Sequence, residues 1–136
     1  MRKILALTLA LFLVGCERGG TGPEDGLTGR YKLLTASGVS IPGVVGDNGS
    51  YRWEILAGEV RIARDSSYVF TLDNRETAGN TVQVTQIQEK GFVRPGGGNL
   101  EFRAQDDGRL RMKGSLSGDT LTLLTGFGPD FVFRRN

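Results

Sequence analysis

Few residues in this 136-residue chain could carry chemistry. It has no histidine, and Cys16 is its only cysteine. Imidazole catalysis, histidine metal ligation, an internal disulfide and a multi-thiolate metal site are therefore excluded. Lys32, Lys90 and Lys113 are the only lysines beyond residue 15, and no pattern couples any of them to a nucleophile. We expect no catalytic residue, no metal site and no cofactor, and we predict that the protein is not an enzyme.

The remaining chemistry belongs to the Cys16 thiol. Two basic residues precede an apolar run over residues 4–14, which is typical of a signal peptide and too short to span a bilayer. The run leads into Leu13-Val14-Gly15-Cys16, which resembles the lipobox of bacterial lipoproteins. That resemblance implies cleavage before Cys16, a diacylglyceryl group on its thiol, and an acylated amino terminus carrying fatty acids such as palmitate.

Acyl chains on Cys16 would anchor the protein to a membrane, because each buried methylene contributes about 0.8 kcal/mol. Glu17 stands at the position where Asp favours inner-membrane retention in some bacteria. We therefore expect the outer membrane in a Gram-negative cell, on either the periplasmic or the surface side, and the cell membrane otherwise. Residues 1–15 are then the signal peptide, residues 16–28 the lipidated cysteine with a flexible tether, and residues 29–136 the folded domain.

Removal of the signal peptide also removes the charge imbalance. The full chain has 17 Lys and Arg against 15 Asp and Glu, and Arg2 and Lys3 account for the difference. A domain without net charge lacks the basic surface typical of nucleic-acid binding, so we expect no nucleic-acid partner.

The folded domain alternates apolar and polar residues with a period of two, which predicts strands with one buried face. The alternating runs are 31–35, 51–55, 60–62, 68–72, 81–90, 100–102, 110–112, 121–123 and 131–133. We expect eight or nine strands of roughly six to eight residues and no helix. Residues 73–80 are predicted to form a turn, and a parity change before Ile87 predicts a bulge near Thr85. So many short antiparallel strands predict a barrel or a sandwich.

Four segments resemble the small lipocalin-like lipoproteins of bacteria: Gly29-x-Tyr31-x-Leu33, residues 38–42, the hairpin over 114–123, and residues 131–135. The resemblance implies an all-β fold, a small antiparallel up-and-down barrel of about eight strands. Lipocalins carry Trp where this chain has Tyr31, with an Arg from near the last strand packed across it. We predict that Arg135 stacks on Tyr31 or Trp53 and closes one barrel end.

Aromatic residues dominate the apolar face of the predicted strands, and they could line a ligand site in the barrel interior or at its mouth. The candidate ligand-binding residues are Tyr31, Trp53, Tyr68, Phe70, Phe102, Phe131, Phe133 and Arg135. The same residues could form an ordinary core, and we favour a mostly filled interior with at most a shallow mouth. Residues 38–50 are apolar for a loop and form either a lid or, as we favour, a packed plug or short strand.

Two functions fit these features. The first is a carrier or sensor that binds a small apolar ligand at the barrel mouth. The alternative is an interaction module that docks on another envelope protein, or inhibits a protease, through loops at the barrel end. A cavity near about 300 Å³ would favour the first, and a filled interior beneath an exposed loop patch the second. We expect a monomer in either case.

Overall fold

The computed structural model describes residues 26–126 and 128–136, and the predictions for the signal peptide and Cys16 lie outside them. A helical turn at Gly26 and Leu27 precedes the first strand. The strands are β1 (Gly29–Ala36), β2 (Val39–Ser40), β3 (Gly43–Asp47), β4 (Tyr51–Ile62), β5 (Ser67–Ala78), β6 (Thr81–Gly96), β7 (Asn99–Ala104), β8 (Leu110–Ser117), β9 (Thr120–Leu124) and β10 (Phe131–Arg135). Within the described ranges, no helix is long and apolar enough to cross a membrane.

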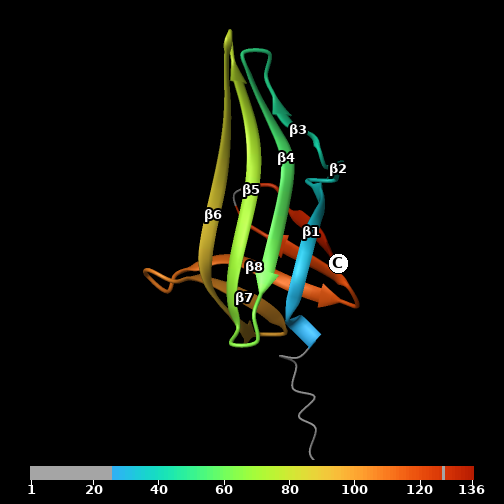
Figure 1. The fold of residues 1–136 in the computed structure, drawn as a ribbon, viewed down its shortest axis with the longest axis vertical. Helices are drawn as coiled ribbons and strands as arrows, with labels where there is room; N and C mark the ends of the chain where they lie inside the picture. The colour runs from blue at the N-terminus through green and yellow to red at the C-terminus, as the bar shows by residue number, and fades with distance from the viewer. Residues whose placement is uncertain (1–25, 127) are drawn as a thin grey trace, which may run out of the picture.

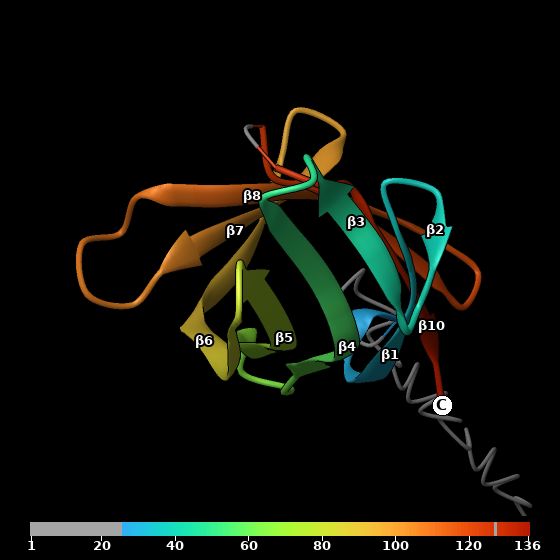
Figure 2. The ribbon, with the colours of Figure 1, turned by 90° about the horizontal axis from the view of Figure 1, so that it is seen from above.

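Eight of the strands close into an antiparallel barrel, as the sequence predicts. From β4 to β10 each strand pairs with the next one in the chain, and β1 pairs with both β10 and β4 to complete the ring. The ring is visible from above in Figure 2. The short strands β2 and β3 lie outside it, where β2 pairs with β1 and β3 pairs with β4.

Side chains fill the middle of the barrel. Strand alternation directs one face of every barrel strand inward, and the buried apolar residues form one cluster from Leu27 to Phe133. The Tyr68 ring packs edge-on against Phe102 with centroids 5.1 Å apart, and Phe70 lies 5.7 Å from Phe131. Because residues 26–136 contain both the closed sheet and this cluster, we expect them to fold as an independent domain.

The strands β4, β5 and β6 are longer than the sequence predicts. They contain 12, 12 and 16 residues, and β4 joins the runs 51–55 and 60–62, which the sequence separates, through a register shift between Ile55 and Ala57. In Figure 1 the three strands rise together beyond the rest of the barrel. We call the part of these strands that lies beyond the barrel the arm.

The predicted turn over residues 73–80 is wrong. β5 continues to Ala78, and only Gly79 and Asn80 form the turn, with Gly79 at a positive φ of 57°. Cross-strand partners hold the polar residues of this segment in the sheet: Arg75 contacts Glu54 at 3.2 Å, and the Gln86 amide donates to Asp73 at 2.8 Å.

The predicted bulge near Thr85 is also wrong. β5 and β6 pair without a register shift from Ser67 and Phe92 to Ala78 and Thr81. The valines of this segment and Ile87 therefore lie on opposite faces of the arm, and Ile87 remains 48% exposed. No bulge is needed, because neither face of the arm is fully buried there.

Candidate functional site: a cleft at the barrel end

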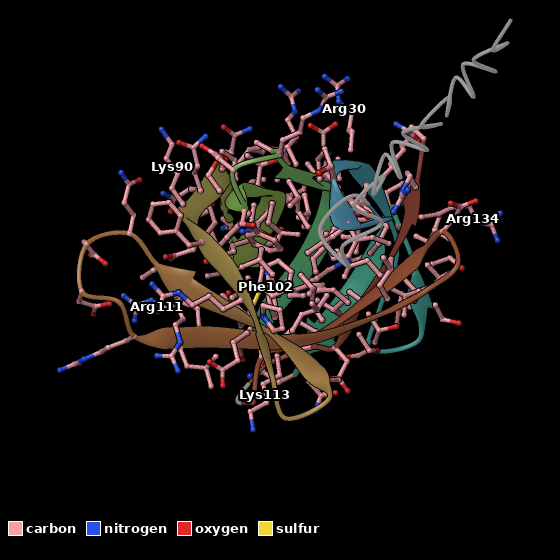
Figure 3. All side chains as sticks on the ribbon, turned by 90° about the horizontal axis from the view of Figure 1, so that it is seen from below. Arg30, Lys90, Phe102, Arg111, Lys113 and Arg134 are labelled. Carbon is pink, nitrogen blue, oxygen red and sulfur yellow. The ribbon has the colours of Figure 1, made fainter. Side chains whose placement is uncertain are left out.

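A cleft of about 590 Å³ opens at the end of the barrel where β1 begins. Its wall is formed by the ends of β6, β7 and β8, the β6–β7 turn, the β4–β5 turn and the segment before β1. The lining residues are Leu27, Ser66, Val93, Pro95, Gly96, Gly97, Gly98, Asn99, Leu100, Gly114, Ser115 and Leu116. Figure 3 views this end, with Phe102 inside the ring of strands and Arg30, Lys113 and Arg134 pointing outward.

Glycines shape two walls of the cleft. In the β6–β7 turn, Gly97 and Gly98 have φ values of 57° and 83°, which residues with a side chain rarely adopt. In β8, a Cβ on Gly114 would lie 2.8 Å from the Phe102 ring and 2.9 Å from the Leu123 side chain. Gly114 therefore allows Phe102 to fill the barrel directly beside the cleft.

A hydrogen-bond network fixes Leu27 at the cleft. The Tyr31 hydroxyl donates to the Leu27 carbonyl at 2.7 Å, and the Arg135 guanidinium donates to the Tyr31 hydroxyl at 2.7 Å and to the Gly26 carbonyl. The guanidinium carbon also lies 5.2 Å from the Tyr31 ring centroid, which confirms the predicted cation–π contact with Tyr31 rather than Trp53. The network holds residues 26 and 27, which precede β1 and which we call the entry segment, across the barrel end.

Burial and Arg135 have opposite effects on the pKa of the Tyr31 phenol. Burial raises its pKa above the ordinary value of 10.0, while the hydrogen bond and positive charge of Arg135 act to lower it. The net pKa shift is upward, so the phenol keeps its proton and donates to Leu27 throughout the neutral range.

The predicted aromatic residues do not line the cleft. Six of them are buried in the core, and none is among the residues that line the cleft: Tyr31, Tyr68, Phe70, Phe102, Phe131 and Phe133. Trp53 is partly buried and packs against the core from the arm strand β4. Arg135 does not line the cleft. It hydrogen-bonds to Gly26 in the entry segment and to Tyr31, which in turn holds Leu27.

The sequence carries a signal for three of the cleft residues. Val93, Leu100 and Leu116 continue the inward alternation of their strands close to the β6–β7 and β8–β9 turns. The inward-facing residue nearest a turn lies at a barrel mouth, because the strand ends there. Leu27 gave no such signal, since its surroundings have the composition of a tether.

The short strands β2 and β3, which pair with β1 and β4, also pack against the core. As favoured from the sequence, residues 38–50 form short packed strands, β2 and β3, and Ile41 and Val45 contact the core cluster.

Asn74, on the inner face of β5, is 1% exposed, and its amide has no hydrogen-bond partner within the described residues.

No family model, no curated protein and no solved structure matches the chain. The resemblance to lipocalin-like lipoproteins therefore stays a prediction from the sequence motifs. The closed barrel and its end cleft are the observations on which a function can be argued.

Proposed function

We propose that the protein binds a small apolar molecule in the cleft at the barrel end. The supporting observation is the cleft itself, since its volume of about 590 Å³ falls within the range of about 300–1,000 Å³ that is usual for ligand sites. Leu27, Val93, Pro95, Leu100 and Leu116 provide an apolar surface. An apolar surface with a few polar groups is the usual composition of a small-molecule site.

The polar groups of the cleft indicate the chemistry of the ligand. Ser66, Asn99 and Ser115 can donate or accept hydrogen bonds, and no charged side chain lines the cleft among the described residues. A bound ion would lose its hydration there without gaining a charged partner. The proposed ligand is therefore an uncharged, mainly apolar molecule, and the protein acts by binding rather than by catalysis.

We further propose that Cys16 is lipidated and that the protein is an exported lipoprotein, anchored in the outer membrane of a Gram-negative host. Leu27, in the cleft wall, follows Cys16 by eleven residues. A flexible segment of that length has a root-mean-square reach of about 20 Å. The proposed anchor would thus keep the cleft within a short distance of a bilayer, where apolar molecules accumulate.

Binding is tested with N-phenyl-1-naphthylamine, an uncharged apolar fluorophore, titrated into residues 26–136. Leu116→Trp is expected to fill the cleft and lower the affinity at least about tenfold, the loss of roughly 1.4 kcal/mol. Leu110→Trp is the matched control, because Leu110 lies in the same strand at the other end and is already exposed. Failure of the unsubstituted barrel to bind, or equal binding by both variants, would contradict the proposed site.

Lipidation is tested separately in the full chain. Cells that express it are labelled with radioactive palmitate, and the membranes are analysed for a labelled band. We expect label in the unsubstituted chain and none in Cys16→Ala, which also keeps its signal peptide. Equal labelling of both chains, or a mature protein cleaved at another residue, would refute the anchor without bearing on the cleft.

A further inference from the structure

Strand β6 has a long edge to which no described strand pairs. It pairs with β5 from Thr81 to Phe92, but with β7 only from Gly91 to Gly96. Where β6 parts from β7, Gln88, Glu89, Lys90, Gln105 and Asp106 line a hollow of about 590 Å³. Figure 1 shows β6 as the outermost strand of the arm. We call residues 81–88 the free edge.

The backbone groups that point outward from this edge can be identified. Lys90 accepts a hydrogen bond from the Gln105 N–H on the β7 side, whereas the Val93 N–H donates to Ser66 on the β5 side. Successive residues of a strand direct their N–H and C=O groups to alternate sides, and β6 has no register shift against β5. The even-numbered residues therefore present these groups to the free edge: Val82, Val84, Gln86 and Gln88.

The free edge lacks the features that usually prevent pairing. Natural edge strands carry lysines, prolines, bulges or inward-pointing charges. Residues 81–88 contain no charged residue, no proline and no glycine, and they are rich in Val, Ile and Thr. Val82 and Val84 are 61% and 62% exposed. A regular, uncharged strand of this kind is suited to accept another strand.

We propose that the free edge pairs with the same edge of a second copy of this chain, antiparallel and about a two-fold axis. The sequence predicts a monomer, and this edge argues for a dimer instead. The inference is independent of the cleft and of lipidation. It would join the two arms into one continuous sheet.

Charge placement favours a second copy. Glu89 and Lys90 follow the free edge at its barrel end. Antiparallel pairing places them beside the uncharged far end of the partner edge, so like charges do not meet. On the neighbouring strand β5, Arg75 and Asp73 already have partners in Glu54 and Gln86.

Shape favours the same arrangement. Each barrel lies at the Gly96 end of its own β6, and the arm projects away from it (Figure 1). In an antiparallel pair the two barrels lie at opposite ends of the joined strands, so the arms can meet without a clash between barrels. A two-fold contact uses the same edge of both copies, so this contact closes at two chains.

The alternation of backbone groups restricts the register. Because both copies present even-numbered residues, hydrogen-bonded pairs must join an even-numbered residue to an even-numbered one. The two positions in each pair then add to an even number, so the two-fold axis passes beside one residue rather than between two. One residue of the edge must therefore lie directly opposite itself.

Cysteine cross-linking in the full chain tests this geometry. Each position from 82 to 88 is replaced singly by cysteine, and cells that express the variant are oxidised and analysed for disulfide-linked dimer. Directly opposite Cα atoms lie about 5 Å apart, and one residue away the separation is about 8 Å, beyond the range of about 4.4–6.8 Å that a disulfide requires. We expect one maximum, with a yield at least about tenfold lower two residues away.

Two controls accompany the scan. The unsubstituted chain measures cross-linking through Cys16, and Lys113→Cys places an exposed thiol on β8, away from the free edge. No dimer above these controls at any position, equal yields at all seven positions, or a cross-link to a different protein would each overturn the proposal.

Amide exchange in residues 26–136 provides a second measurement. Exchange at Val82, Val84, Gln86 and Gln88 is expected to slow as protein concentration rises, because pairing protects these amides. Gln83, Thr85 and Ile87 already bond to β5 and should not change. Fast, concentration-independent exchange at the four even-numbered positions up to millimolar protein would also overturn the proposal.

Discussion

Two buried tyrosines should respond in opposite ways to the same substitution. Tyr31 is fully buried and Tyr68 is 2% exposed, so the substitution of either tyrosine by phenylalanine removes a hydroxyl from the core. The Tyr31 hydroxyl has two hydrogen-bond partners, Leu27 and Arg135. The Tyr68 hydroxyl is buried and has no partner within the described residues.

The free-energy changes follow from these contacts. Tyr31→Phe removes one neutral hydrogen bond, worth about 1 kcal/mol, and one charge-assisted bond, worth about 1.5–3 kcal/mol. We therefore expect its free energy of unfolding to fall by about 2–4 kcal/mol. Tyr68→Phe removes a polar group whose burial without a partner costs about 1–3 kcal/mol. We expect it to be neutral or to raise stability by about 1 kcal/mol.

The assay is urea denaturation of residues 26–136, followed by the fluorescence of Trp53, the only tryptophan. Trp53 lies on β4 and packs against the core, so unfolding exposes it. The two variants serve as controls for each other, because both delete one oxygen from a buried ring. Equal destabilisation by Tyr31→Phe and Tyr68→Phe would refute the reasoning.

Three further predictions concern the same barrel end and core. Arg135→Ala should lower the melting temperature more than Arg135→Lys, because lysine keeps the charge near Tyr31; equal melting of Arg135→Ala and the unsubstituted barrel would contradict the network. Burial raises the pKa of Tyr31 and Tyr68, so their contribution to stability should be complete below the unfolded pKa of 10.0 and should be lost as pH rises above it. Tyr68→Phe should weaken this loss of stability at alkaline pH. An unchanged alkaline unfolding transition in Tyr68→Phe would contradict the raised pKa of Tyr68. Gly114→Ala should destabilise the barrel by about 1–3 kcal/mol through contact with Phe102, whereas Gly26→Ala, with open space around it, should not; circular dichroism on heating compares the two variants.

Alternation made the barrel predictable. Each ring strand needs an apolar inner face, so residues such as Leu121, Leu123, Phe131 and Phe133 identify both the strand and its orientation. Alternation also identifies Arg135, because it is in phase with the inward phenylalanines, whereas Tyr31 or Trp53 as its partner is what the resemblance to lipocalins implies.

The arm was not predictable from local pattern. Asp73 and Asn74 are typical turn residues, and what keeps them in a strand is pairing with residues distant in sequence. Glu54 and Arg75 are 21 positions apart, and Asp73 and Gln86 are 13 positions apart. Such contacts leave no trace in a window of neighbouring residues.

The cleft was missed for a related reason. Leu27 belongs by composition to the tether, and it becomes part of a wall only because Tyr31 and Arg135 hold its segment across the barrel end. Arg135 lies 109 positions from Gly26. The aromatic residues fill the barrel, which is the alternative that the sequence favours, and smaller aliphatic residues line its mouth.

Native mass spectrometry of the protein purified from an envelope extract tests the central claim most directly. We predict an added mass that is lost on unfolding and is absent from Leu116→Trp but present in Leu110→Trp. The released molecule should be uncharged and mainly apolar. A bare protein mass, or an added mass that survives Leu116→Trp, would contradict the proposal that the cleft at the barrel end is a ligand site.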